Sequence, residues 1–166
     1  FCPNEYKRPD IELKIFRNKN NREEVWRPFK KYHYLDEKLH QASEQWIATI
    51  NGQLVAHTGI IQFPMRKGWK RVHRLVVLPD FQGIGIGTRF INEVTKHYIE
   101  NCFNMNLTTT TPALVHALAR DNNWTLVRSG RTKNTMAKNF KRYGATVGTE
   151  ATKSDNRITY SFNWKK

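Results

Sequence analysis

Two stretches of the chain, near its beginning and at its end, place an apolar residue at every second position. Residues 11–15 alternate Ile, Leu and Ile with charged residues, and residues 158–164 alternate Ile, Tyr, Phe and Trp with Thr, Ser and Asn. Side chains on a β-strand point alternately to its two faces, so this period predicts half-buried strands. Both stretches are therefore expected to lie in a sheet.

A period of three to four residues predicts helices elsewhere. It runs through 22–32, where Pro28 is expected to distort or shorten the helix, and through 86–101. A third helix is expected from Thr111-Pro112, an N-cap followed by proline, to about Arg120. A short helix is also expected at 136–143.

The remaining strands follow from β-branched and aromatic residues. Segments 45–50 and 54–63 flank Asn51-Gly52, the preferred pair for a two-residue type I′ hairpin turn. A basic loop, 64–70, leads into the strongest strand signal, 72–78, which stops at Pro79. Two shorter strands are expected at 105–109 and 124–127, whereas 130–155 is polar, basic and irregular. The order predicts a mixed α/β domain with an antiparallel first half and crossover helices in the second.

Length and composition narrow the class of protein. The 166 residues predict one domain spanning 1–166, and the apolar content of 39% is enough for a core. The longest apolar run, 75–78, is far shorter than the roughly 18 residues of a membrane-spanning helix. We therefore expect no membrane segment.

The two cysteines, Cys2 and Cys102, form neither a C-x-x-C pair nor a zinc spacing with histidine, so no disulfide scaffold and no metal site are predicted. No signal peptide is recognisable, and a reducing, cytoplasmic location is expected. Because the chain starts with Phe1, we expect it to come from a longer, multidomain polypeptide.

Positive charge is concentrated at the C-terminal end. The net charge is +14, and residues 128–166 hold ten Lys/Arg and two acids, a net of +8. Such a segment suits an anionic partner, of which DNA or RNA is the commonest. It also suits a solubilising surface or a docking strip for a further domain.

The most informative stretch is 74–89, in which a buried strand enters a loop with glycine at 83, 85 and 87, and an amphipathic helix follows. Glycines allow a ligand to approach the backbone, and the start of a helix attracts phosphate. A Walker A loop would need Gly-Lys-Ser/Thr, whereas Gly87 is followed by Thr88-Arg89. The dinucleotide fingerprint would need glycine at position 88 and an acid beyond the helix. Both alternatives fail.

The pattern Gln82-x-x-Gly85-x-Gly87 after Val77-Leu78-Pro79 resembles the acyl-CoA pyrophosphate loop of the GNAT superfamily of N-acyltransferases. The element order is similar to that superfamily over nearly the whole chain. The resemblance implies a central mixed sheet of six to seven strands flanked by helices, and acetyl-CoA as co-substrate. It implies CoA-binding roles for these residues: Leu75, Val76 and Val77 for the pantetheine arm, and Gln82, Gly83, Ile84, Gly85, Ile86, Gly87 and Thr88 for the pyrophosphate. Arg89 or Lys96 would meet the outer phosphates, and Thr109 to Thr111 would flank the thioester.

The usual acid of that superfamily, a tyrosine, is absent, because its position corresponds to Ala119. His116, one helical turn earlier, is a candidate acid. His73, two residues before Leu75 and expected on the same face of the strand, is a candidate base. Histidine titrates in the range that both tasks need, although a purely structural role stays open for each. His33-Tyr34-Leu35 is a further candidate segment for the acceptor site.

The acceptor is expected to be an amine on a nucleic acid or on a molecule associated with one, with the basic loop 66–71 and the basic C-terminal segment beside its cleft. His-Tyr-Leu at 33–35 and His-Arg-Leu at 73–75 also look loosely similar to Mom-type DNA-modification acyltransferases of phages. Acetylation of a protein amine or of aminoacyl-tRNA is an alternative. A non-catalytic nucleic-acid-binding module with the same fold is another.

Overall fold

The computed structural model describes residues 11–19, 21–32, 39–64, 66–131 and 158–165. These residues form one seven-stranded mixed sheet with the strand order β1-β2-β3-β4-β5-β7-β6. The strands are β1 (Lys14–Arg17), β2 (Glu44–Ile50), β3 (Gln53–Gln62), β4 (Trp69–Val77), β5 (Asn104–Thr109), β6 (Trp124–Arg131) and β7 (Ile158–Trp164). The helices are α1 (Arg22–Trp26), α2 (Ile86–Glu100) and α3 (Pro112–Arg120), with 3-10 turns η1 (Lys30–Tyr32) and η2 (Pro79–Phe81). The predicted mixed α/β fold is confirmed.

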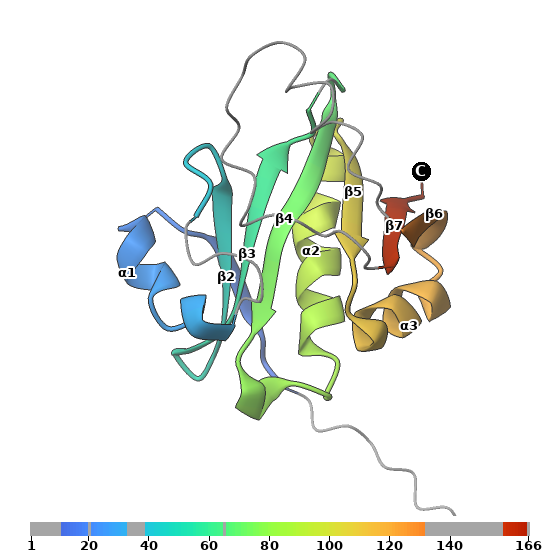
Figure 1. Cartoon of the computed structure of the whole chain (residues 1–166). Coiled ribbons are helices and arrows are strands. Elements are labelled where there is room, and N and C mark those ends of the chain that lie inside the picture. The colour runs from blue at the N-terminus through green and yellow to red at the C-terminus, as the bar shows by residue number, and fades with distance from the viewer. Residues whose placement is uncertain (1–10, 20, 33–38, 65, 132–157, 166) are drawn as a thin grey trace, which may run out of the picture.

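The first four strands are antiparallel neighbours, whereas β4 and β5 are parallel and are joined through α2. Strand β7 then lies between β5 and β6, antiparallel to both. Figure 1 shows α1 beside β2 and α3 on the opposite side of the molecule, next to β5 and β6. The carboxyl ends of β4 and β5 therefore lie at the same end of the sheet, as in any parallel pair.

Most of the predicted elements are present, with shifted ends. The hairpin turn has positive φ at both Asn51 and Gly52, as a type I′ turn requires. The 22–32 helix stops at Trp26, two residues before Pro28, and resumes only as η1. The first strand begins at Lys14, so the apolar alternation begins before the paired segment.

Two expected loops are wrong in part. Trp69 and Lys70 belong to β4, because they pair with β5 and β3 respectively. Strand β6 continues from Trp124 to Arg131 because β7 pairs with it on both sides of a bulge at Val127. The helix expected at 136–143 lies outside the described residues.

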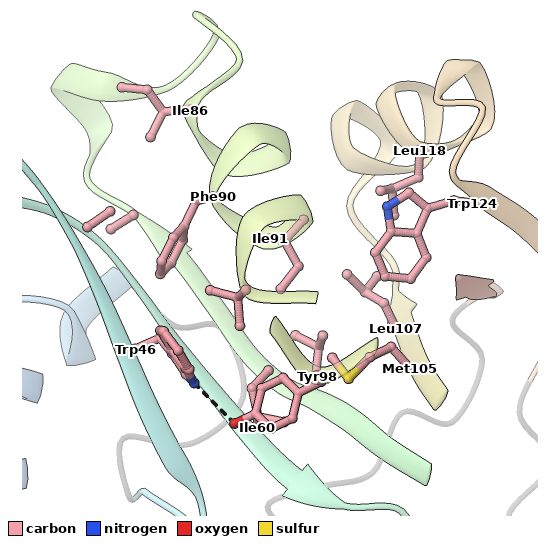
Figure 2. Close-up of a cluster of buried hydrophobic side chains, with 14 of the residues drawn as sticks. Trp46, Ile60, Ile86, Phe90, Ile91, Tyr98, Met105, Leu107, Leu118 and Trp124 are labelled. Atoms are coloured by element: carbon pink, nitrogen blue, oxygen red, sulfur yellow. Dashed lines mark hydrogen bonds between the residues drawn. The ribbon is translucent and has the colours of Figure 1, made fainter. Parts of the chain in front are cut away.

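The main core lies between the sheet and helices α2 and α3 (Figure 2). The 3.6-residue period of α2 buries Ile86, Phe90, Ile91, Val94 and Tyr98 against the sheet, as predicted. A second, smaller cluster on the opposite face joins Trp26 and Phe29 from the α1 segment to Val76 of β4. Each face of β4 is therefore packed against a different layer. None of the described helices is long and apolar enough to span a membrane.

A polar network fixes the end of the sheet where β4 begins. Glu44 of β2 accepts hydrogen bonds from Lys70 Nζ and from the Tyr98 hydroxyl, each at 2.8 Å, and Arg17 lies 3.1 Å away. Trp46 Nε1 donates to the same hydroxyl at 3.1 Å, the bond drawn in Figure 2. Burial alone would raise the pKa of the Glu44 carboxyl, but these hydrogen bonds and positive charges outweigh burial and lower it.

Candidate active site

The parallel strands β4 and β5 separate before they end. Their pairing runs from Trp69 and Asn104 to Val72 and Leu107 and then stops. Strand β4 nevertheless continues to Val77, paired with β3, and β5 continues to Thr109, paired with β7. Over residues 75–77, β4 therefore has no strand on its β5 side in the part of the chain that the structure describes. An extended ligand can hydrogen-bond to a strand edge of this kind.

The glycine loop follows directly and begins α2. Gly83 and Gly85 have φ values of 81° and 87°, the left-handed region that glycine adopts without strain, and Gly85 is the N-cap of α2. Gly87 is needed for a different reason, because a Cβ there would lie 3.2 Å from Cγ2 of Val77. The first turn of α2 thus packs directly on the free end of β4.

Three backbone N–H groups, those of Ile86, Gly87 and Thr88, point out of the first turn of α2 without an intrahelical acceptor, as at any helix start. No side chain caps this helix. Together with the glycine loop they form a site suited to an anion. Gln82 differs from the expectation, because its N–H donates to the Pro79 carbonyl at 3.1 Å.

The Gln82 side chain holds the glycine loop against the end of β4. Its Nε2 donates to the carbonyl oxygen of Val77 at 2.8 Å, so it ties the loop to the last residue of β4. We therefore interpret Gln82 as a residue that positions the glycine loop.

The two cations expected at the outer phosphates are engaged elsewhere. Arg89 donates to the carbonyl of Ile11 at 3.0 Å. Lys96 pairs with Glu93 at 2.7 Å and lies ten residues after Ile86, about 15 Å along the helix at 1.5 Å per residue. A contact of either cation with the outer phosphates stays a prediction.

A β-bulge changes the expected orientation of His73. Residue Ile60 pairs with Val72 and Gly59 pairs with Arg74, so His73 is the extra residue on β4. Leu75 packs on the main core, whereas the Arg74 guanidinium lies 5.3 Å from the Trp26 ring on the opposite face. The expectation that His73 and Leu75 share a face is wrong, because the bulge shifts the alternation between them.

His73 is exposed on β4, and its ring centroid lies 5.5 Å from that of His40. The carbonyl of His40 accepts hydrogen bonds from Arg22 of α1 and from the Ser43 hydroxyl. The His40–His73 pair therefore lies on the face of α1, next to the point where β4 and β5 separate. Sequence reasoning missed His40, which no motif marks.

His116 is exposed on α3, a helix that packs on the other face of the sheet through buried Leu118. Ala119, where the resemblance implies a tyrosine in relatives, is exposed on the same helix. Trp124 is buried, and its Nε1 donates to Asn92 Oδ1 of α2 at 2.8 Å. At the end of β5, Thr109 is buried and accepts a hydrogen bond from the N–H of Thr111 at 3.1 Å.

A second feature that the sequence analysis missed is a polar network on the face of His73. Asn106 of β5 is buried, and its Nδ2 donates to Ser161 Oγ at 2.9 Å and to Asn163 Oδ1 at 2.8 Å, both on β7. The Thr108 hydroxyl lies 3.2 Å from Ser161 Oγ. The neighbours Met105 and Leu107 face the main core. This half of the sheet is therefore apolar on one face and polar on the other.

The basic loop lies at the other end of β4 from the glycine loop, and its role beside the acceptor cleft stays a prediction. The turn between β3 and β4 holds Arg66 over the Trp69 ring at 4.7 Å, and it precedes β4, whereas the glycine loop follows β4. The length of β4 therefore separates the two. His33, Tyr34, Leu35, Tyr143 and most of the basic C-terminal segment lie outside the described residues. Within the described ranges, no group of three or more His, Cys, Asp or Glu residues could hold a metal ion.

Solved structures share this architecture. The ribosomal-protein-S18-alanine N-acetyltransferase from Escherichia coli matches with a TM-score of 0.64 at 12% identity, covering 92% of each chain. A Bacillus subtilis acetyltransferase in complex with CoA matches with a TM-score of 0.66 at 10% identity, covering 93% of this chain and 99% of the other. A GNAT family acetyltransferase from Elizabethkingia anophelis with acetyl-CoA bound gives 0.62 at 11%, covering 93% and 98%. At these identities the matches show the fold.

A search of curated proteins finds no significant match. The sequence model of the acetyltransferase (GNAT) family, however, matches residues 10–119. This range contains the separation of β4 from β5, the glycine loop and nearly all of α3. The chain therefore belongs to the acetyltransferase (GNAT) family.

Proposed function

We propose that this chain transfers an acetyl group from acetyl-CoA to an amine on a nucleic acid or on a molecule associated with one. The observation that carries the donor half of the proposal is the separation of β4 from β5 after Val72 and Leu107, directly before the glycine loop. The CoA-bound and acetyl-CoA-bound proteins of the same fold support the choice of donor.

The chain's own residues fit this donor. Residues 75–77 offer the free edge of β4 to the pantetheine arm, which carries amides able to pair with a strand. The backbone of 83–88 and the start of α2 suit the pyrophosphate, whose negative charge the helix N-terminus favours. A Cβ at Gly87 would fill the space between Val77 and the first turn of α2. The glycine therefore leaves room for the ligand there.

Acetyl-CoA supplies an acyl thioester, which an amine can attack directly. The new C–N bond forms at the acetyl carbonyl carbon, the C–S bond breaks, CoA leaves as the thiolate, and the amine loses one proton. His73, exposed beside the strand separation, is proposed to accept that proton, and His116 is proposed to protonate the thiolate. A thiol has a pKa of about 8.5, so its departure needs only modest help.

The charge distribution favours an anionic acceptor. The chain carries a net charge of +14, and a molecule of this charge attracts polyanions and repels free polyamines. A nucleic acid fits this requirement best. The cytoplasmic location expected from the cysteines stays a prediction.

Acetyl-CoA binding can be tested by thermal unfolding. At a hundredfold excess over its dissociation constant, acetyl-CoA should stabilise the fold by about 2.7 kcal/mol. Gly85→Glu should abolish the stabilisation because it puts a carboxylate where phosphate binds. Gly52→Glu is the matched control, since Gly52 also has positive φ, at 81°, but lies in the β2–β3 turn. A stabilisation that survives in Gly85→Glu would overturn the donor site.

The acceptor can be tested with labelled acetyl-CoA and fractionated cell components. Label in DNA or RNA supports the proposal. Label in protein, in aminoacyl-tRNA or in small amines overturns the acceptor half and keeps the donor half. Binding of acetyl-CoA without any transfer points to a non-catalytic module.

A further inference from the structure

The strands of the central and C-terminal part of the sheet are strongly cationic. Strands β3, β4, β5, β6 and β7 contain no Asp or Glu, and they contain Lys70, Arg71, Arg74, Arg128 and Arg131. The helix that covers the main core is balanced instead, because α2 holds two basic and two acidic residues, Arg89, Lys96, Glu93 and Glu100. These five strands therefore carry positive charge with no acidic residue among them.

Arg128 lies on the polar face of this sheet. It pairs with Ser161 across β6 and β7, and directly paired residues share a face. Ser161 accepts from Asn106, whereas its neighbours Tyr160 and Phe162 pack on the main core. The side chain of Arg128 therefore points away from α2 and α3, and it is exposed.

The strand register sets these residues in one row across the sheet. Thr108 of β5 pairs with Ser161 of β7, which pairs with Arg128 of β6. On the other side of the row, Val72 and Leu107 are the last pair before the strands separate, and His73 and Thr108 are the next residues of the two strands. The row therefore runs from His73 through Thr108 and Ser161 to Arg128, and it crosses the separation between β4 and β5.

The row has a different chemical group at each position. The imidazole of His73 lies at one end, next to the point where β4 and β5 separate. Two hydroxyls lie in the middle, and a guanidinium with five N–H donors lies at the other end. Two paired-strand spacings separate the Cα atoms of Thr108 and Arg128, about 10 Å, and the wider gap between β4 and β5 adds to the distance from His73. An acceptor that uses both ends is larger than a simple amine and presents an anion at a distance from its reacting nitrogen.

We infer that Arg128 binds a backbone phosphate of the nucleic acid acceptor, while the base bearing the reacting amine lies toward His73. Guanidinium and phosphate match in geometry as well as in charge, because the planar donors can bind two phosphate oxygens at once. The absence of acids from these strands leaves no carboxylate there to repel the phosphate. This inference rests on the proposed function and names the surface on which the acceptor binds.

The test measures binding of fluorescein-labelled 20-nucleotide probes by anisotropy, with duplex DNA, single-stranded DNA and single-stranded RNA as separate arms. For duplex DNA, loss of one phosphate contact should make the log–log salt slope shallower by about 0.9. Arg128→Gln should therefore weaken binding of the preferred probe several-fold at low salt, and Arg128→Lys should restore part of it. The control is Arg120→Gln, which removes the same charge from an exposed position on α3.

Equal effects of Arg128→Gln and Arg120→Gln would overturn the inference, because they would show a response to net charge alone. A parent protein that binds none of the three probes would overturn it as well. Thermal stabilisation by acetyl-CoA, measured on the same variants, should stay unchanged. If acetyl-CoA did not stabilise the parent protein, the proposed donor would be wrong. That outcome is separate from the result on Arg128.

Discussion

A Cβ atom at Gly87 would lie 3.2 Å from Cγ2 of Val77. This contact is tighter than ordinary van der Waals packing, and it lies where the first turn of α2 meets the free edge of β4. The two residues therefore set the separation between the anion site and the strand that is proposed to hold the pantetheine arm.

Gly87→Ala is expected to weaken acetyl-CoA binding, because Val77 or the start of α2 must shift to admit the methyl group. Its effect on stability should be small, since alanine favours a helix over glycine by about 1 kcal/mol and offsets part of the strain. Isothermal titration gives the affinity and thermal unfolding gives the stability. In a double-mutant cycle, Val77→Ala should restore binding to Gly87→Ala; no restoration would contradict a steric cause.

The contacts of Glu44 predict that the folded protein loses stability at acidic pH. Although burial alone would raise the pKa of this carboxyl, Lys70, Tyr98 and Arg17 lower it in the folded state. A carboxyl with a depressed folded pKa contributes stability above its unfolded value, about 4.3, and that stability is lost as the pH falls through the folded pKa. Urea unfolding between pH 3 and 7 should therefore show a steeper fall for the parent protein than for Glu44→Gln.

At pH 7, Glu44→Gln should lower the free energy of unfolding by about 1–3 kcal/mol, because Lys70 and Tyr98 lose a charged acceptor. Glu93→Gln is the control, since Glu93 pairs with Lys96 at an exposed position on α2. An exposed pair of this kind is worth about 1 kcal/mol or less. Equal effects of the two substitutions would show that the Glu44 network does not anchor this end of the sheet.

The sequence predicts α2 and its buried face well, because fifteen residues repeat a single period and the glycine loop marks the start. The fold class follows from the same pattern together with the Gln82 to Gly87 motif. The bulge at His73 could not be predicted, since 72–78 is apolar at positions that face both layers. The alternation that would reveal a shift is absent there.

Features that depend on contacts between distant strands were also beyond the sequence. The separation of β4 from β5 depends on where each strand finds another partner, β3 for one and β7 for the other. Arg128 was expected near a polar, irregular segment, and only its pairing with Ser161 places it on the face of His73. His40 is brought to His73 by a loop that no local pattern describes.

Asn106 should be required for stability, because its buried amide joins β5 to β7. Asn106→Ala removes the donor for Asn163 Oδ1 and the Phe162 carbonyl, at 2.8 and 3.1 Å, and is expected to cost about 1–3 kcal/mol. Asn104→Ala is the control on the same strand. The side chain of Asn104 reaches Gly68 only at 3.4 Å, and its backbone N–H keeps the 2.8 Å bond to the same carbonyl. Chemical denaturation of both variants decides whether the amide network matters.

The two candidate catalytic histidines should contribute unequally. His73 lies beside the strand separation, on the face where the acceptor is proposed to bind, so His73→Ala should lower kcat by roughly 10²–10⁴. The same variant should bind acetyl-CoA normally, because the proposed donor contacts begin at Leu75. His116→Ala should cost less, since the CoA thiolate can leave without a proton donor. His116 also lies on a helix that packs on the opposite face.

Steady-state kinetics with the acceptor found by labelling tests this order, and the pH profile separates a proton acceptor from a structural residue. A catalytic base must be neutral to accept a proton, so kcat/KM should fall as the pH is lowered. This fall should be present in the parent protein and in His116→Ala and missing from His73→Ala. Retention of more than about a third of kcat by His73→Ala would show that His73 is structural. The proton would then have to leave through His33, Tyr34 or a bound water molecule. Substitution of the residue responsible would change the pH profile of kcat/KM.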